Sequence, residues 1–290
     1  MNSASFRSGR SLLGLLLGCI FACACLLRAD KPKEDDRPVV DDSKAKVQQA
    51  ANATLPTLFV VGDSTARSNA PMRGWGDELA PFFDTTKVNV LNRAIGGRSS
   101  RTYIVEGRWD KVLAEMKAGD FLIVQFGHND VGALDAKGKF RGSLRGTGEE
   151  TEDVKKPDGS VETVHTYGWY LRKYVTDAKA KGVTVIVASS VPHKNWVNDF
   201  ADFRKHAASV AAAHGAAFID VTAITSATYE KLGAEKVATL FQDERTHTNT
   251  AGARINAESV VAGIRGLDTH PLAALLSKLG QAVPAHRPAQ

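Results

Sequence analysis

Short apolar runs alternate with amphipathic stretches along residues 56–267. Residues 57–61 form a continuous β-branched and apolar run, as is typical of a strand covered on both faces, and similar runs lie at 88–91, 121–126, 183–188 and 217–220. Helical patterns lie between and after them, among them 74–83, 107–117, 166–181, 200–213 and 251–265. Strands that alternate with helices form parallel sheets. The pattern therefore predicts an α/β fold in which helices sandwich a parallel sheet of five strands.

The first 29 residues differ from the rest in composition. Arg7 and Arg10 precede an apolar run from Ser11 to Leu27, which is typical of an export signal. Cleavage would follow the small residues at 22–24, or the signal would be of the bacterial lipoprotein type with a lipid on Cys19; a retained signal anchor is the third interpretation. We expect a periplasmic or secreted protein, or one held at the cell surface by that lipid.

Residues 30–55 are charged and lack an apolar period, so they predict a flexible linker. Residues 268–290 predict a C-terminal tail with one short helix. The domain at 56–267 has about 210 residues, enough for one sizeable core. All three cysteines lie at positions 19, 23 and 25, so the domain contains no disulfide.

Net charge gives little support to nucleic-acid binding. The formal charge is +5, but three of the 37 Lys and Arg residues, and none of the 32 Asp and Glu residues, lie in 1–29. The remainder is therefore close to neutral, which removes the main electrostatic argument for a nucleic-acid partner.

Four polar segments occur where ligands bind in parallel α/β sheets, beyond the carboxyl ends of strands. They are 62–65, 94–100, 127–130 and 243–249. Ser64, in a glycine-led turn entering a helix, is either a nucleophile or a helix N-cap. His247 has carboxylates three and four residues before it, and is either a general base or a surface histidine beside an N-cap.

Gly97 and Asn129 could donate hydrogen bonds to an oxyanion, although both also suit ordinary turns. Metal and nucleotide sites are not indicated, because the chain has no His-x-x-x-His pair, no cysteine after Cys25 and no phosphate-binding glycine spacing. Residues 131–165, rich in glycine and acidic residues, are too long for a simple connection. They predict either a functional rim or lid, or a solvated insertion without a role.

These segments resemble, in order, the four blocks of the SGNH (GDSL) hydrolases. The details are most similar to rhamnogalacturonan acetylesterases: Thr65 after the serine, the 94–101 block, the 165–172 stretch and the His-Thr-Asn sequence at 247–249. The resemblance implies a flavodoxin-like three-layer α/β/α sandwich with a five-stranded parallel sheet, and no metal or cofactor. It also implies the following roles: Ser64 as nucleophile, His247 as base, and an oxyanion hole formed by the Ser64 and Gly97 amides with the Asn129 side chain.

The triad acid departs from the family pattern. The family has Asp three residues before the histidine, whereas this chain has Glu244 there and Asp243 one residue earlier. We expect Glu244 to be the triad acid, with Asp243 as the alternative.

The resulting functional hypothesis is a monomeric exported serine esterase that removes O-acetyl groups from polysaccharide, with rhamnogalacturonan, a pectin, as the preferred candidate. Alternatives within the superfamily are xylan or other glycan acetylesterases, lipases and thioesterases. A non-catalytic glycan-binding surface protein is the alternative outside enzymes, and the joint presence of all four block residues argues against it. Four tryptophans are either core residues or sugar platforms: Trp75, Trp109, Trp169 and Trp196.

Overall fold

The computed structural model describes residues 51–197, 199–267 and 270–287. The chain divides into two units, 1–38 and 39–290, and every described residue belongs to the second. The expected export signal and all but the last five residues of the expected linker therefore lie outside the described residues.

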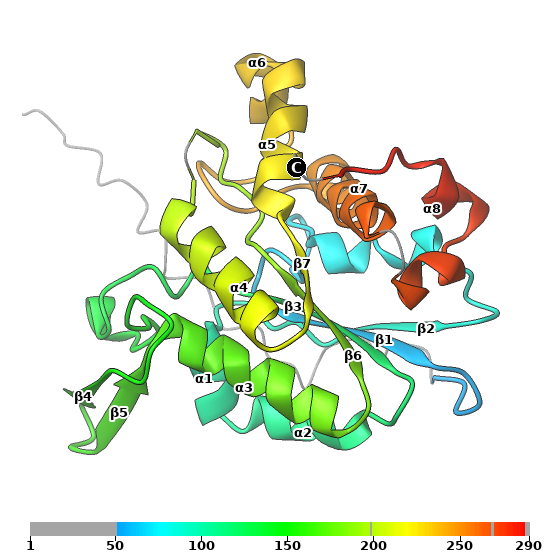
Figure 1. Cartoon of the computed structure of the whole chain (residues 1–290). Coiled ribbons are helices and arrows are strands. Elements are labelled where there is room, and N and C mark those ends of the chain that lie inside the picture. Colours follow the sequence, from blue (N-terminus) through cyan, green and yellow to red (C-terminus); the bar gives the residue numbers. More distant parts are fainter. Residues whose placement is uncertain (1–50, 198, 268–269, 288–290) are drawn as a thin grey trace, which may run out of the picture. The chain divides into compact units, whose positions relative to one another are not determined.

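A sheet of five parallel strands forms the centre of the fold, in the order β2-β1-β3-β6-β7 (Figure 1). The strands are β1 (Thr57–Gly62), β2 (Asn89–Asn92), β3 (Phe121–Gln125), β6 (Thr184–Ala188) and β7 (Ala217–Ile219). Each lies within one residue of a predicted apolar run. The predicted α/β fold with five parallel strands is confirmed.

Helices cover both faces of the sheet, which gives three layers (Figure 1). One face packs against α1 (Ser100–Val105), α2 (Arg108–Glu115), α3 (Tyr167–Ala180) and α4 (Ala201–Ala213). The other packs against α5 (Val221–Leu232) and α7 (Thr250–Gly266), with α6 (Ala234–Ala238) following α5.

Side chains of β1 point alternately into two hydrophobic cores, one on each face of the sheet. Leu58 and Val60 belong to the cluster that contains Val260 of α7, whereas Phe59 and Val61 belong to the cluster on the α3 side. Successive side chains of a strand point to opposite faces, so a continuous apolar run supplies both cores at once. Burying each such side chain contributes about 1.5–3 kcal/mol.

The predicted helix at 74–83 is wrong. This segment forms two short 3₁₀ helices, η2 (Trp75–Asp77) and η3 (Ala80–Phe82). The Trp75 and Gly76 amides donate to the Thr65 and Ala66 carbonyls instead of continuing a helix. A Cβ at position 74 would lie 2.2 Å from the Ala66 carbonyl carbon, so glycine permits this close approach.

The long 131–165 segment contains regular structure that the sequence did not predict. It includes a 3₁₀ turn, η4 (Ala136–Gly138), and an antiparallel hairpin of β4 (Thr151–Lys155) and β5 (Val161–His165). In Figure 1 the hairpin projects beside α3 as a separate two-stranded ribbon.

The domain continues beyond the boundary predicted at residue 267. The segment forms η5 (Pro271–Leu275) and the expected short helix, α8 (Lys278–Ala282). Leu272 and Leu276 are buried in the same core as α7. Leu276 also forms an antiparallel bridge with Phe83, so this stretch closes the core rather than trailing from it.

Candidate active site

Ser64 lies in a tight turn directly after β1. The Ala66 and Arg67 amides both donate to the Asp63 carbonyl, and the Asp63 carboxylate accepts the Thr65 amide at 2.9 Å and its hydroxyl at 2.7 Å. The expected helix after Ser64 does not form, so neither an N-cap role nor a helix terminus applies to this serine. The turn leaves the Ser64 side chain partly exposed at the carboxyl end of β1.

The Ser64 hydroxyl contacts His247, 183 residues away in sequence. Oγ of Ser64 lies 2.7 Å from Nε2 of His247, and Nδ1 of His247 lies 2.5 Å from Oδ2 of Asp243. A carboxylate accepts only, so Nδ1 carries the hydrogen and Nε2 presents its lone pair to the serine. His247 is 6% exposed, and the N-cap of α7 is the nearby Asn249. This is the arrangement in which an imidazole can remove a hydroxyl proton.

The expectation that Glu244 holds the imidazole is wrong. Residues 243–246 form a bend and not a helical turn, so spacing on a helix face does not apply. Glu244 is exposed, whereas Oδ1 of Asp243 accepts the amides of Arg245, Thr246 and His247. Asp243 therefore both shapes the loop and contacts the histidine.

The environment of Asp243 keeps this carboxyl ionised. Partial burial by itself would raise its pKa, but the hydrogen bond from the His247 ring and those from three backbone amides outweigh this effect. Together they hold the pKa of Asp243 well below its ordinary value. An ionised Asp243 can orient His247 and stabilise the charge that the ring gains with a proton.

Gly97 occupies a turn after β2 with φ +74°, a left-handed conformation that favours glycine. In the described part of the chain, neither the Gly97 nor the Ser64 amide donates to another group. Both amides are therefore available to a bound oxygen atom.

Asn129 follows β3, and its Nδ2 donates to the Arg98 carbonyl at 2.9 Å. Arg98 directly follows Gly97, so this bond joins the loops after β2 and β3. Because β2 and β3 flank β1 in the sheet, Gly97 and Asn129 come from the loops on either side of Ser64. The sheet order thus brings together the residues expected from three separate segments.

Two buried carboxylates lie beneath these loops. Asp130 accepts the Ser100 hydroxyl at 2.5 Å and the Ser143 hydroxyl at 2.7 Å, which ties α1 and the 131–165 segment to the loop after β3. Burial, with a smaller contribution from the nearby Asp63 carboxylate, raises the pKa of Asp130 to about 6 despite these hydrogen bonds. Burial also raises the pKa of Asp63.

His128 belongs to a second histidine network. Its Nε2 donates to the Val191 carbonyl at 2.9 Å, and its Nδ1 lies 3.2 Å from Nε2 of His193. Nδ1 of His193 lies 2.8 Å from the Asp199 carboxylate. Burial and the neighbouring His193 lower the pKa of His128 well below its ordinary value. His128 is therefore neutral beside the site.

The tryptophans have mixed positions. Trp75 and Trp109 are fully buried and belong to the core, and Trp196 packs in part against a smaller apolar cluster. Trp169 stacks on His165, with the two ring centroids 3.8 Å apart. One face of the Trp169 ring is thus already covered by protein.

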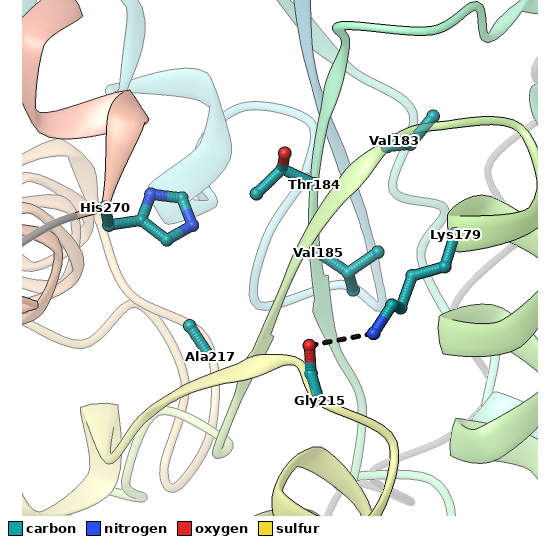
Figure 2. Close-up of a pocket in the computed structure, with 7 residues that line it drawn as sticks. All are labelled: Lys179, Val183, Thr184, Val185, Gly215, Ala217 and His270. Atoms are coloured by element: carbon teal, nitrogen blue, oxygen red, sulfur yellow. Dashed lines mark hydrogen bonds between the residues drawn. The ribbon is translucent and has the colours of Figure 1, made fainter.

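A cavity of about 290 Å³ lies at the amino-terminal ends of the strands, opposite the end of the sheet that carries Ser64 (Figure 2). It is bounded by the amino ends of β6 and β7 at Thr184 and Ala217, by His270 and by Lys179, whose ammonium donates to the Gly215 carbonyl. Ser64 follows the carboxyl end of β1, so this cavity is not part of the candidate active site.

Within residues 51–197, 199–267 and 270–287, no group of three or more His, Cys, Asp or Glu side chains is placed to hold a metal ion. Within the same residues, no helix combines the length and apolar character needed to cross a membrane.

Comparison with known proteins finds relatives among ester hydrolases. A family model described as the GDSL-like Lipase/Acylhydrolase family matches residues 60–255. A rhamnogalacturonan acetylesterase of Emericella nidulans is 34% identical over 221 residues, covering 73% of this chain and 86% of that protein. A probable rhamnogalacturonan acetylesterase of Bacillus subtilis, YesY, is 30% identical over 223 residues, covering 72% and 93%.

Solved structures show the same fold. The crystal structure of Bacillus subtilis YxiM matches with a TM-score of 0.59 at 24% identity. The match covers 74% of this chain and 58% of the YxiM chain. The family match includes Ser64, Gly97, Asn129 and His247, the residues that the resemblance singled out. The chain therefore belongs to the GDSL-like lipase/acylhydrolase family and is a carboxylic ester hydrolase.

Proposed function

We propose that this protein is an exported serine esterase that removes O-acetyl groups from polysaccharide, with rhamnogalacturonan as its substrate. The observation that carries the catalytic part is the continuous hydrogen-bonded chain from Ser64 through His247 to Asp243. All three side chains come from one polypeptide, so the triad requires no second copy of the chain, and we propose that the enzyme is a monomer.

In the first half of the reaction, His247 Nε2 takes the proton of Ser64 while Oγ attacks the acetyl carbonyl carbon. Asp243 holds the ring and stabilises its positive charge. The carbonyl oxygen becomes negative and accepts hydrogen bonds from the Ser64 and Gly97 amides and from Asn129 Nδ2. His247 then gives its proton to the departing sugar oxygen, which leaves acetyl-Ser64 and a free hydroxyl on the polymer.

In the second half, His247 removes a proton from water, and the resulting hydroxide attacks the acetyl carbon. The same donors hold the second oxyanion. The bond to Oγ breaks, Ser64 recovers its proton from His247, and acetate leaves. No other reactant is required.

The substrate assignment rests on the relatives. The two relatives at 34% and 30% identity are named as a rhamnogalacturonan acetylesterase and a probable one, and both are matched over most of their length. An enzyme of this kind needs room for only a two-carbon acyl group at Ser64.

Export rests on the N-terminal sequence pattern, with its basic start and apolar run. A polysaccharide substrate lies outside the cell, so an exported esterase could reach it. We propose that the mature protein is periplasmic, secreted or attached to the cell surface through a lipid on Cys19.

Acetate release from a panel of polymers tests the function. We expect purified protein to release acetate from acetylated rhamnogalacturonan faster than from acetylated xylan, and none from polymers saponified beforehand. The Ser64→Ala variant is the matched control and should release none. Preferential release from xylan would transfer the substrate to that glycan, and hydrolysis confined to long-chain acyl esters would contradict the acetylesterase assignment.

A further inference from the structure

The Asn129 amide is held at both ends. Its Nδ2 donates to the Arg98 carbonyl at 2.9 Å, and its Oδ1 accepts from Nη1 of Arg141 at 3.3 Å. A flipped amide would place oxygen against a carbonyl oxygen and NH₂ against a guanidinium, which can only donate. The two partners therefore specify one orientation, and Nδ2 has a second hydrogen for a substrate oxygen.

The same guanidinium lies next to Gly97. A Cβ at position 97 would lie 3.3 Å from Nη2, 3.5 Å from Cζ and 3.6 Å from Nη1 of Arg141. One cation thus contacts Asn129 and borders Gly97, the two residues proposed to hold the oxyanion together with Ser64.

Arg141 belongs to the 131–165 segment, and the next two residues are anchored to buried groups. The Gly142 carbonyl accepts Nη1 of the fully buried Arg101 at 2.7 Å. Ser143 binds Asp130 twice, with its amide donating to the backbone carbonyl and its hydroxyl to the carboxylate.

The backbone around Arg141 is closely packed and strained. Position 142 has no space for a side chain, since a Cβ there would lie 2.4 Å from the Gly132 carbonyl oxygen. Phe140 has φ +49°, a conformation that is costly for a bulky residue and persists only where the surroundings impose it. Such a segment fixes the backbone from which Arg141 extends.

We propose that Arg141 is a positioning residue, supplied by the 131–165 segment, that orients the Asn129 amide for oxyanion binding. This inference rests on the proposed function, in which Asn129 donates to the oxyanion. An oxyanion donor works because it is aligned before the charge develops, so an amide free to rotate loses part of its effect. The segment then has a catalytic purpose and is not merely a solvated insertion.

A double-mutant cycle on p-nitrophenyl acetate tests the proposal. Methionine keeps much of the arginine stem and removes its donors, so Arg141→Met should lower kcat about tenfold with KM changed less than about twofold. In the Asn129→Ala background, the same substitution should cost less than about twofold, because the group on which Arg141 acts is gone. The control is Arg145→Met, since Arg145 lies in the same segment, 68% exposed and paired with Asp202, and should leave kcat unchanged.

The possible results separate this proposal from the function it rests on. Loss of the Arg141 effect in the Asn129→Ala background supports it. An equal loss in both backgrounds, a rise in KM alone, or no loss at all would overturn it, and the first two would make Arg141 a substrate contact. If Asn129→Ala itself were fully active, the oxyanion assignment would fail instead.

If Arg141→Met were unable to fold, which thermal unfolding would reveal, a second variant would keep the proposal testable. Arg141→Lys keeps the charge but has no planar fork of donors. It should fold and should also show a lower kcat that disappears in the Asn129→Ala background. A Lys variant with full kcat would overturn the proposal, because charge alone would then suffice.

Discussion

The Asp243 carboxylate contacts the His247 ring with one oxygen and the backbone amide of the same residue with the other, at 2.5 and 3.0 Å. The loop between them is closed by a bridge of Phe241 with Thr248 and by the Gln242 amide, which donates to the His247 carbonyl at 2.7 Å. The short Asp side chain thus holds the ring and its own loop together. A substitution here should affect both the orientation and the charge of the base.

We therefore predict that Asp243→Asn lowers kcat by between about tenfold and about 10⁴-fold, because an amide cannot stabilise a charged imidazole as a carboxylate does. Glu244→Gln is the matched control and should change kcat less than about twofold, since Glu244 is exposed. Both variants would be measured side by side on p-nitrophenyl acetate. A larger loss in Glu244→Gln would return the role to that residue.

Ser64→Ala should reduce ester hydrolysis by at least about 10³-fold without unfolding the protein, because it removes the attacking oxygen. Ser160→Ala, in the exposed turn between β4 and β5, should retain full activity. Initial rates on p-nitrophenyl acetate and circular dichroism spectra check both expectations. Substantial activity in a folded Ser64→Ala protein would place the nucleophile elsewhere.

Asn129→Ala should lower kcat by about 10²–10³-fold and change KM little, because an oxyanion donor acts mainly in the transition state. Steady-state kinetics over a range of ester concentrations separate the two parameters. If KM rose while kcat held, Asn129 would be a ground-state substrate contact.

The raised pKa of Asp130 predicts that the stability of the protein depends on pH. Its pKa is about 6 in the folded protein, above the ordinary 3.8, so between these values the folded protein keeps a proton that the unfolded chain releases. The stabilisation is therefore full below about pH 3.8 and is lost as pH rises through 6, by roughly 3 kcal/mol.

In Asp130→Asn this loss should disappear, because the amide oxygen can still accept from Ser100 and Ser143 but does not titrate. Urea unfolding from pH 4 to pH 7 would give the free energy of unfolding at each pH, and its decrease with pH should be smaller in the variant than in the wild type. If the unfolding free energies of variant and wild type changed with pH in parallel, Asp130 would have the same pKa in the folded and unfolded states.

The C-terminal segment should contribute to stability. Leu272 is fully buried, so Leu272→Ala should cost about 2–5 kcal/mol of unfolding free energy. Leu279 is 41% exposed, and Leu279→Ala should cost less than about 0.5 kcal/mol. Urea unfolding compares the two; equal, small effects would mean that residues 271–282 are dispensable for the fold.

The sequence by itself determined the sheet and the positions of three loops. Largely apolar runs of four to six residues that alternate with helical patterns indicate buried parallel strands, because both faces of each strand must be covered. In such a sheet the polar residues after β1, β2 and β3 meet at one edge, so Ser64, Gly97 and Asn129 could be expected together. The order of the strands then set which loops flank Ser64.

Only the tertiary structure decided between Asp243 and Glu244 and revealed Arg141. Both acids are close enough to His247 in sequence, and the choice depends on the path of the bent loop, in which Asp243 accepts hydrogen bonds from the amides of residues 245–247 and Glu244 faces solvent. Arg141 lies in a stretch without periodicity, and its place at Asn129 follows from the anchoring of Gly142 to Arg101, 41 residues earlier, and of Ser143 to Asp130, 13 residues earlier. Local propensity determines elements, whereas contacts between distant loops are determined by packing and hydrogen bonds of the folded chain.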